Sequence, residues 1–534
     1  MAASNENKDR QVVPRWRTFR EALNSGELSS VEVLKSPRID ATGFIQEKER
    51  DFKENKALPF ALDLVSAATV LGNTEISVEA AQFILENENK TSETGIGLAR
   101  ALLGISEPVK PIIIPQSRIQ VVEGIKELKR KRITQRKNAF VWVDLAQLYT
   151  LLGQNNQARQ ALRIALALAP SERFVVRSAV RFLHHINEEE EALMLLRKNP
   201  RTQIDPWLMA AEIAASDLAE KSSRFARIGG AFLEKADIHR YHTSELASAL
   251  ATLEMKAGKH RHSNKLFYES LRVPTQNALA QAVWASKRAG LDAINPELLV
   301  KAQASEAITL DLFNRGVWQD VITGAAKWSK EEGFSPRPHI LASSVSASLL
   351  DRPDQAESIA TKGLETNPRN PILLNNKAFA QILQGKITEA NKTLSEVDLE
   401  NTHLRDKICL LATTGLAFFR SGKSEEGRQC YQKAINLANA PEDVGLKTLA
   451  SLYLAREEVL QGNKEGFKDF KRAYQTAEKL KQTNIPAIAE RLVFDIGKEA
   501  ARQSVPFEMP KETKPVFIEG DFFGPKSKAI VRRR

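Results

Sequence analysis

The sequence predicts an all-α protein built from stacked pairs of antiparallel helices, and three observations support this prediction. Ala- and Leu-rich stretches with the 3.6-residue period of helices run through most of the 534 residues, whereas the alternating pattern of strands is nearly absent. Small residues recur 34 positions apart, as Ala158 and Ala192 and again as Ala356 and Ala390. Glycines, which tolerate the positive φ of a tight turn, follow helical stretches at Gly153, Gly258, Gly385, Gly422 and Gly462.

The clearest helix pair runs from Ala139 to Pro170. Apolar, small and turn residues stand there at fixed offsets: Trp142, Leu145, Ala146, Tyr149, Gly153, Ala158, Leu162, Ala165 and Pro170. This pattern resembles the tetratricopeptide repeat, whose signature is W-x2-L-G-x2-Y, then A-x3-F, then P. Ala146 takes the place of the glycine and Leu162 that of the phenylalanine. The resemblance implies a right-handed superhelical solenoid, whose concave face is lined by the first helix of each pair and binds a protein partner.

Weaker copies of the pattern extend the prediction along the chain. Residues 336–477 carry usable motifs and residues 240–290 carry faint ones. Across residues 201–335 the register drifts, although helix signals remain. Asp205 and Pro206, for example, are typical of the N-cap and the first position of a helix.

Composition divides the chain into four parts. Residues 1–55 form a polar arm that is expected to be partly disordered. Residues 56–137 contain helical hairpins without a repeat signature, including helices over 58–71 and 78–85, and end in the basic stretch 126–137. Residues 138–503 form the solenoid, and residues 504–534 form a flexible tail that is basic and aromatic.

Aromatic residues in both terminal segments indicate docking. Trp16, Phe19 and Leu23 follow the i, i+3, i+7 spacing of an amphipathic helix, which would dock either on the solenoid itself or on a partner. Phe522 and Phe523 lie in a tail that is too polar to bury enough apolar surface alone. We therefore expect Trp16, Phe522 and Phe523 to contribute to binding.

The net charge of +11 is concentrated in two segments. Lys126 to Lys137 contains seven basic residues and one acidic residue, and Lys526 to Arg534 contains five basic and no acidic residues. A solenoid that binds nucleic acid along its groove would be basic throughout. We therefore favour a solvated helix face and a solubilising tail. Contact with an anionic partner or nucleic acid stays the alternative, with four candidate residues, Lys129, Arg130, Lys131 and Arg132.

Motifs of catalysis and of cofactor binding are missing from the sequence. It contains no phosphate-binding G-x-x-x-x-G-K-[ST] and no nucleophile motif G-x-S-x-G. We expect neither a cofactor nor a metal at His239, His242, His260 and His262, because a helix separates the two pairs. Cys409 and Cys430 are expected to stay reduced. Since no apolar run of about 18 residues occurs, we expect a cytoplasmic protein with no membrane partner.

The function that we predict is that of a non-catalytic scaffold or adaptor, which binds a protein partner through its concave face. The groove positions of the first helices give four candidate contact residues, Gln147, Thr150, Asn375 and Phe379. Two alternatives remain: a nucleic-acid-associated protein that uses residues 126–137, and an enzyme with an unrecognised site in residues 1–137 or 201–335.

Overall fold

A computed structural model describes most of the chain. The described residues are 10–19, 41–71, 75–91, 93–103, 105, 117–134, 138–235, 239–291, 294–400, 402–480, 484–505 and 507. Across these residues the regular secondary structure is helical, without a strand. Phe522 and Phe523, and with them nearly all of the predicted tail, lie outside the described residues.

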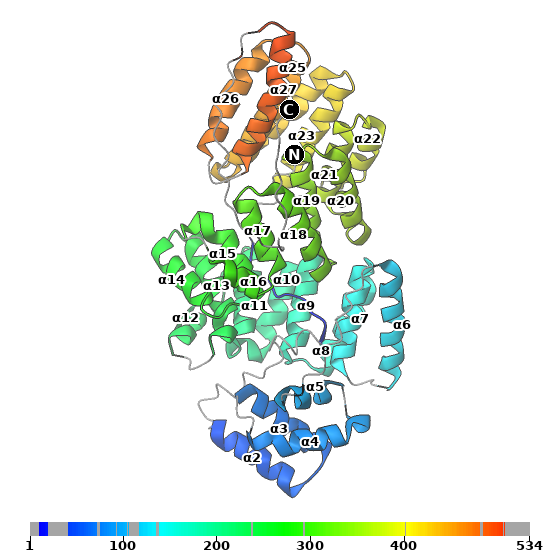
Figure 1. Ribbon diagram of the computed structural model, residues 1–534, viewed down its shortest axis with the longest axis vertical. Helices are drawn as coiled ribbons and strands as arrows, with labels where there is room; N and C mark the ends of the chain where they lie inside the picture. The colour runs from blue at the N-terminus through cyan, green and yellow to red at the C-terminus, as the bar shows by residue number, and fades with distance from the viewer. Residues whose placement is uncertain are drawn as a thin grey trace.

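A small helical unit precedes the solenoid, at the bottom of Figure 1. It consists of α2 (Ala41–Glu54), α3 (Leu58–Leu71), α4 (Val78–Glu86) and α5 (Glu93–Leu102). Phe52 of α2 is 1% exposed and contacts Phe83 of α4, with ring centroids 5.7 Å apart. Residues 41–54 of the predicted polar arm are therefore a helix that packs on this apolar core. The extent of the arm itself stays a prediction, because residues 20–40 lie outside the described residues.

Helix pairs follow one another from residue 139 to residue 479, after the single helix α6 (Arg118–Thr134). The first four pairs are α7 (Ala139–Leu151) with α8 (Asn155–Leu168), α9 (Arg173–His185) with α10 (Glu189–Lys198), α11 (Pro206–Leu218) with α12 (Ala226–Lys235), and α13 (Arg240–Lys256) with α14 (His260–Ser270). The next three are α15 (Gln276–Ala289) with α16 (Pro296–Lys301), α17 (Ser305–Asn314) with α18 (Trp318–Glu331), and α19 (Arg337–Ser348) with α20 (Pro353–Thr366). The last three are α21 (Pro371–Leu383) with α22 (Ile387–Ser395), α23 (Leu404–Arg420) with α24 (Ser424–Leu437), and α25 (Val444–Leu460) with α26 (Glu465–Lys479). The helix α27 (Ile485–Arg502) ends the stack.

The pairs continue through the region where the sequence register drifts. Ala139, Arg173, Pro206 and Arg240 begin first helices 33 or 34 residues apart. The Asp205 side chain accepts a hydrogen bond from the Trp207 backbone N–H, which confirms the predicted N-cap. The repeat thus persists in the backbone even where its signature residues have been replaced.

First and second helices are buried differently. Every residue from Pro206 to Ser216 of the first helix α11 is buried, whereas the second helix α14 buries only Ser263, Phe267 and Ser270. First helices also pack on the next first helix along much of the stack, as α11 does on α13. A helix enclosed on all sides lies inside an assembly, and an amphipathic one covers its surface.

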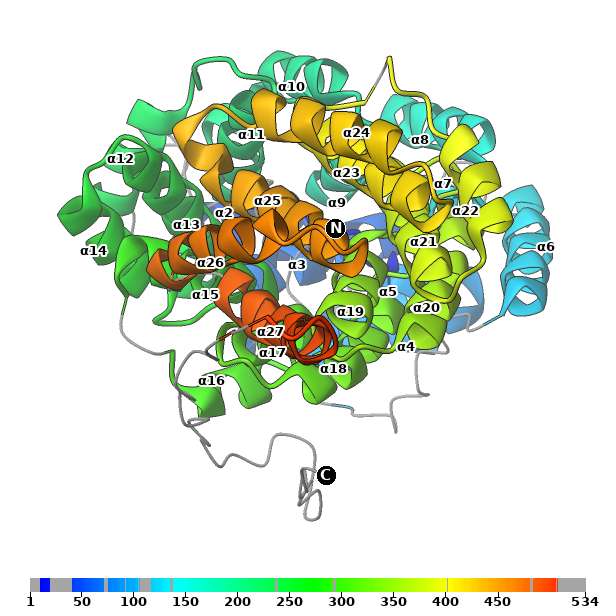
Figure 2. The same ribbon diagram turned by 90° about the horizontal axis from the view of Figure 1, so that it is seen from above.

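The stack winds around an axis, as seen from above in Figure 2. The end of α7 meets the end of α20 across one turn, where the Thr366 hydroxyl donates to the Leu151 carbonyl at 3.4 Å. Arg491 of α27 pairs with Asp351, beside α20, at 3.0 Å. Residues 139–366 therefore form one nearly closed turn, and the later helices are stacked on it (Figure 1). This is the superhelical solenoid of helix pairs that the sequence predicted.

Candidate peptide-binding channel

Residues 10–19 lie inside the first turn of the solenoid, as the dark-blue trace among the cyan and green helices in Figure 1. Arg10 to Thr18 form no helix, whereas Phe19 is helical. The amphipathic helix predicted over Trp16, Phe19 and Leu23 is therefore absent at Trp16, and its continuation to Leu23 lies outside the described residues and stays a prediction. The stretch runs past first helices from both ends of the turn. We call these ten residues the N-terminal segment and the space around them the channel.

Side chains of the channel wall hold the backbone of the N-terminal segment at every third residue. Gln281 Nε2 donates to the Arg10 carbonyl at 2.6 Å, Asn277 Nδ2 to the Val13 carbonyl at 2.9 Å, and Gln147 Nε2 to the Trp16 carbonyl at 3.2 Å. The Phe19 backbone N–H donates to the Asp144 carboxylate at 3.0 Å.

Two helices supply all four of these groups. Asn277 and Gln281 are four residues apart on α15, and Asp144 and Gln147 are three apart on α7, so each pair shares one helix face. Contacts of this kind recognise an extended backbone without regard to its side chains.

Three apolar side chains of the segment enter the wall. Val12 is fully buried in a cluster with Met209, Ile213 and Leu246. Trp16 is 1% exposed and meets the rings of Phe182 and Phe334 edge-on, at centroid distances of 6.1 and 5.5 Å. Phe19 stacks on Phe140 at 4.5 Å. These pockets recognise side chains, and aromatic anchors of this kind dominate binding energies.

Glu306, at the start of α17, is the electrostatic centre of the channel. Its side chain is 1% exposed. Arg10 Nε lies 2.8 Å from Oε1 and Arg15 Nη2 2.6 Å from Oε2, and Arg337 of the wall lies 2.6 Å from Oε1. Burial alone would raise the pKa of Glu306, but the charges of Arg10, Arg337 and Arg15 together hold it well below its ordinary value.

A second buried carboxylate, Glu332, faces the same segment. It lies 3.9 Å from Arg15 and accepts a hydrogen bond from Trp328 Nε1 at 3.0 Å. Burial works against its ionisation, yet the charges of Arg15 and Arg181 lower its pKa. The channel is thus built for a cationic occupant, since unpaired buried carboxylates would be costly.

The structure corrects most of the predicted groove contacts. Thr150 is fully buried and its hydroxyl bonds back to the Ala146 carbonyl of its own helix. Asn375 is 2% exposed, and Phe379, at 1%, packs edge-on against Tyr453 in the core. None of the three side chains is accessible, because the neighbouring first helices cover them. Trp16 is buried in the solenoid of its own chain rather than offered to a partner.

Gln147 alone among the predicted groove residues contacts the segment. Sequence reasoning missed the others, Asn277, Gln281 and Glu306, because they fall in residues 201–335, where the register drifts. Asn277 and Gln281 flank an otherwise apolar Ala-Leu-Ala run at helical spacing. Polar residues spaced in this way on a buried first helix are the signal that could have found them.

The basic stretch is divided between packing and solvent. Arg132 lies over the Trp142 ring and Lys129 over the Tyr149 ring, at 5.0 and 5.7 Å from the ring centroids. Lys131 pairs with Glu127 of its own helix at 3.2 Å, and Arg130 is exposed. None of these four side chains of α6 lines the channel. Binding of an anionic ligand by them stays a prediction.

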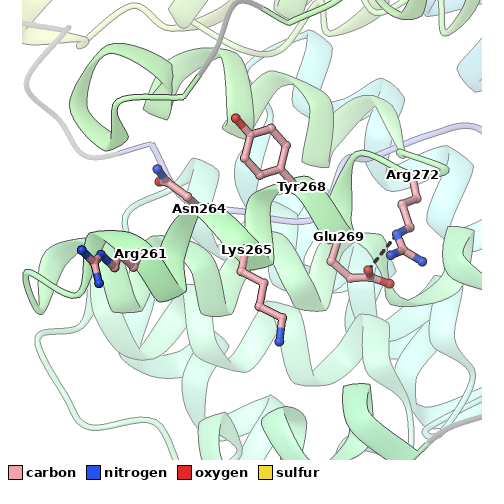
Figure 3. A pocket seen from close by; sticks show the side chains of 6 residues that line it. All are labelled: Arg261, Asn264, Lys265, Tyr268, Glu269 and Arg272. Carbon is pink, nitrogen blue, oxygen red and sulfur yellow. Dashed lines mark ion pairs between the residues drawn. The ribbon is translucent and has the colours of Figure 1, made fainter.

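A recess lies on the outside of the solenoid, away from the channel. It has a volume of about 530 Å³ and is lined by Arg261, Asn264, Lys265, Tyr268, Glu269 and Arg272. Figure 3 shows five of these side chains spread along α14 and Arg272 just beyond its end. Glu269 and Arg272 point toward each other and pair at 2.9 Å, whereas the other four side chains point in different directions. They do not converge on one point where a ligand could sit.

The described residues form neither a metal site nor a membrane span. Among the described residues, no three His, Cys, Asp or Glu side chains come together as a metal would require. No helix in that part combines the length and the apolar character needed to cross a bilayer. Cys409 and Cys430 are not joined by a disulfide.

Known proteins resemble this chain in fold. The family model of the tetratricopeptide repeat matches residues 141–172. The crystal structure of the APC/C hetero-tetramer Cut9-Hcn1 is 11% identical over 92% of this chain and 90% of its own, with a TM-score of 0.47. Human IFIT1, solved as a dimer with PPP-AAAA, is 16% identical over 66% of this chain and 95% of its own (TM-score 0.37). Yeast Tom70 is 12% identical over 87% and 96% (TM-score 0.33).

A comparison with curated proteins gives no match. Residues 141–172 match the tetratricopeptide repeat, and the described chain around them is a stack of helix pairs that continues the period of this repeat.

Proposed function

We propose that the protein is a non-catalytic adaptor that binds an extended segment of a partner protein in the channel. Helical-repeat proteins generally mediate contacts between proteins through such inner surfaces. The observation that carries the proposal is the N-terminal segment itself. Its ten residues, of which the first nine form no helix or strand, are held by wall side chains that bond to the backbone at Arg10, Val13, Trp16 and Phe19.

The chemistry of the channel supports binding rather than catalysis. Its carboxylates, Glu306 and Glu332, are paired with arginines and lie beside neither a nucleophile nor a general base. Their pKa values are lowered, which suits permanent counter-ions and not proton transfer near neutral pH. We place this adaptor in the cytoplasm.

Photo-crosslinking from inside cells tests the proposal. A photoreactive phenylalanine replaces Gln147, which is half-buried in the channel, and in a matched control it replaces the exposed Lys265 on α14. We expect a partner protein to be crosslinked from position 147 and not from position 265. Crosslinks to residues 10–19 of the same chain serve as the internal reference.

Two results would count against this function. Partners crosslinked from position 265 alone would place binding on the outer surface. Partners that disappear when the lysate is treated with nuclease would favour the nucleic-acid alternative through residues 126–137.

A further inference from the structure

We propose that residues 10–19 are an internal ligand, and that the partner segment competing for the channel has the same chemistry: two arginines five residues apart, an apolar residue between them, and a tryptophan after the second. This inference rests on the proposed function and names the class of peptide that the channel accepts. In the chain alone, the N-terminal segment is the competitor that such a partner displaces.

The way in which the segment is bound supports this proposal. An element of the fold is normally held by backbone hydrogen bonds within a helix or sheet, but this stretch is held by wall side chains, as a bound peptide is. Val12 packs in one apolar cluster of the wall, and Trp16 and Phe19 pack in a second, at spacings of four and three residues. These are the features of an anchored linear motif.

The buried charge of Glu306 determines which side chains an occupant of the channel needs. Glu306 accepts hydrogen bonds from two nitrogens of Arg10, at 2.8 and 3.0 Å, and from one nitrogen of Arg15 at 2.6 Å. The wall itself contributes one cation, Arg337, at 2.6 Å from the same carboxylate. Arg10 also donates to Gln281 and Asn277, at 2.6 and 2.9 Å. The planar guanidinium matches this set of acceptors, and a lysine at either position would lose the paired geometry.

Covalent attachment makes the segment a strong competitor. A binding module tethered within one chain experiences an effective concentration on the order of millimolar. A partner peptide of equal intrinsic affinity is therefore excluded until it exceeds that concentration. Substituting the wall weakens both competitors alike, so the informative substitution lies in the segment itself.

Fluorescence anisotropy with a labelled peptide of residues 8–20 tests the competition in the full chain. We expect weak binding to the wild type and at least tenfold tighter binding to Trp16→Ala, whose own segment has lost its anchor. The matched control is Phe494→Ala, which removes an aromatic ring that is 60% exposed on α27 and should change nothing. A labelled peptide with Arg10→Gln and Arg15→Gln should not bind to either protein.

Proteolysis after folding gives a second measurement, which does not depend on a core substitution. A protease site is inserted between residues 20 and 40, and the folded chain is cleaved there. Native mass spectrometry should then show the cleaved N-terminal piece replaced by the labelled peptide, one for one, while the circular dichroism stays helical.

The inference is wrong if the cleaved piece stays bound in a large excess of peptide, or if its departure unfolds residues 139–366. Either result would make the segment a permanent part of the core. A partner crosslinked from position 147 in the absence of exchange would leave the adaptor function standing and remove only the internal ligand. Exchange of the cleaved piece for the peptide, with no partner crosslinked from position 147, would leave the internal ligand standing and remove the adaptor function.

Discussion

Replacing Gly415 with alanine should destabilise the second turn of the solenoid, although alanine is the better helix former. Gly415 of α23 faces Gly427 of α24 where the two helices cross. A Cβ at residue 415 would lie 2.7 Å from Cδ2 of Tyr431 and 2.9 Å from the Gly427 carbonyl oxygen. Tyr431 is 1% exposed, and its ring packs beside Phe419. Neither the ring nor the backbone has room to move.

The two opposing effects can be compared. Alanine gains about 1 kcal/mol over glycine inside a helix. Overpacking a filled core costs about 1–3 kcal/mol, and we take the upper end here because one of the opposing atoms belongs to the backbone. The expected net loss is therefore roughly 2 kcal/mol.

Gly230→Ala in α12 is the matched control, since nothing lies within 4 Å of its added Cβ. That substitution should stabilise the protein by about 0.5–1 kcal/mol, which is the propensity term alone.

Hydrogen exchange is the appropriate assay, because a long repeat array does not unfold in a single two-state step. Gly415→Ala should speed amide exchange in α23 and α24 first, and in their neighbours α21 and α25 next, since coupling in a solenoid passes between adjacent repeats. The reasoning would be refuted if Gly415→Ala exchanged as slowly as the wild type, or if Gly230→Ala exchanged faster.

Three further predictions concern the first turn and the tail. Ala158, fully buried in the core of the first repeat, should not tolerate leucine: Ala158→Leu should cost about 1–3 kcal/mol and lower the Tm, and an unchanged Tm would show that the site is not tightly packed. Burial and, as the second cause, the charge of Arg181 lower the pKa of His184 and of His185 to about 3. Both side chains therefore stay neutral in the folded protein, but in the unfolded chain they gain protons below the ordinary histidine pKa of about 6.5. Stability should therefore fall as the pH drops from about 6.5 towards 3, by about 2 kcal/mol per histidine at pH 5, and a double substitution to phenylalanine should flatten melting curves measured between pH 7 and 5. Deleting residues 504–534 should reduce partner recovery in a pull-down while leaving the repeat core folded; full recovery of every partner together with identical melting would make that tail a solubiliser only.

Local signals explain what could be predicted about the helices. The hairpin of α7 and α8 was found because its turn glycine, its small crossing residue Ala158 and its apolar spacing all lie within about one repeat. The five predicted turn glycines do have positive φ, between 70 and 85°. The register drifted elsewhere because other residues make the same turn. Within residues 201–335, Glu220 and Gln303 adopt φ of 54 and 47° without being glycine.

Contacts between distant residues explain what was mispredicted at the site. Whether a groove position such as Thr150 or Phe379 is open depends on how closely the next first helix approaches, and spacing within one repeat does not specify that. Trp142 and Tyr149, two signature residues of the matched repeat, are only half-buried. The single helix α6 covers them only in part, through Lys129 and Arg132.

The sequence by itself determined the secondary structure, the pairing of helices and the superhelical class, because these follow from periodicity, caps and turns over a few dozen residues. It also marked Trp16 and Phe19 as anchors. Only the tertiary structure decided what they anchor to, since hydrophobic burial has no direction and a pattern shows that a face is covered but not by what. Arg10 and Glu306 are 296 residues apart in the chain, and they meet because one nearly closed turn of the solenoid surrounds the N-terminal segment.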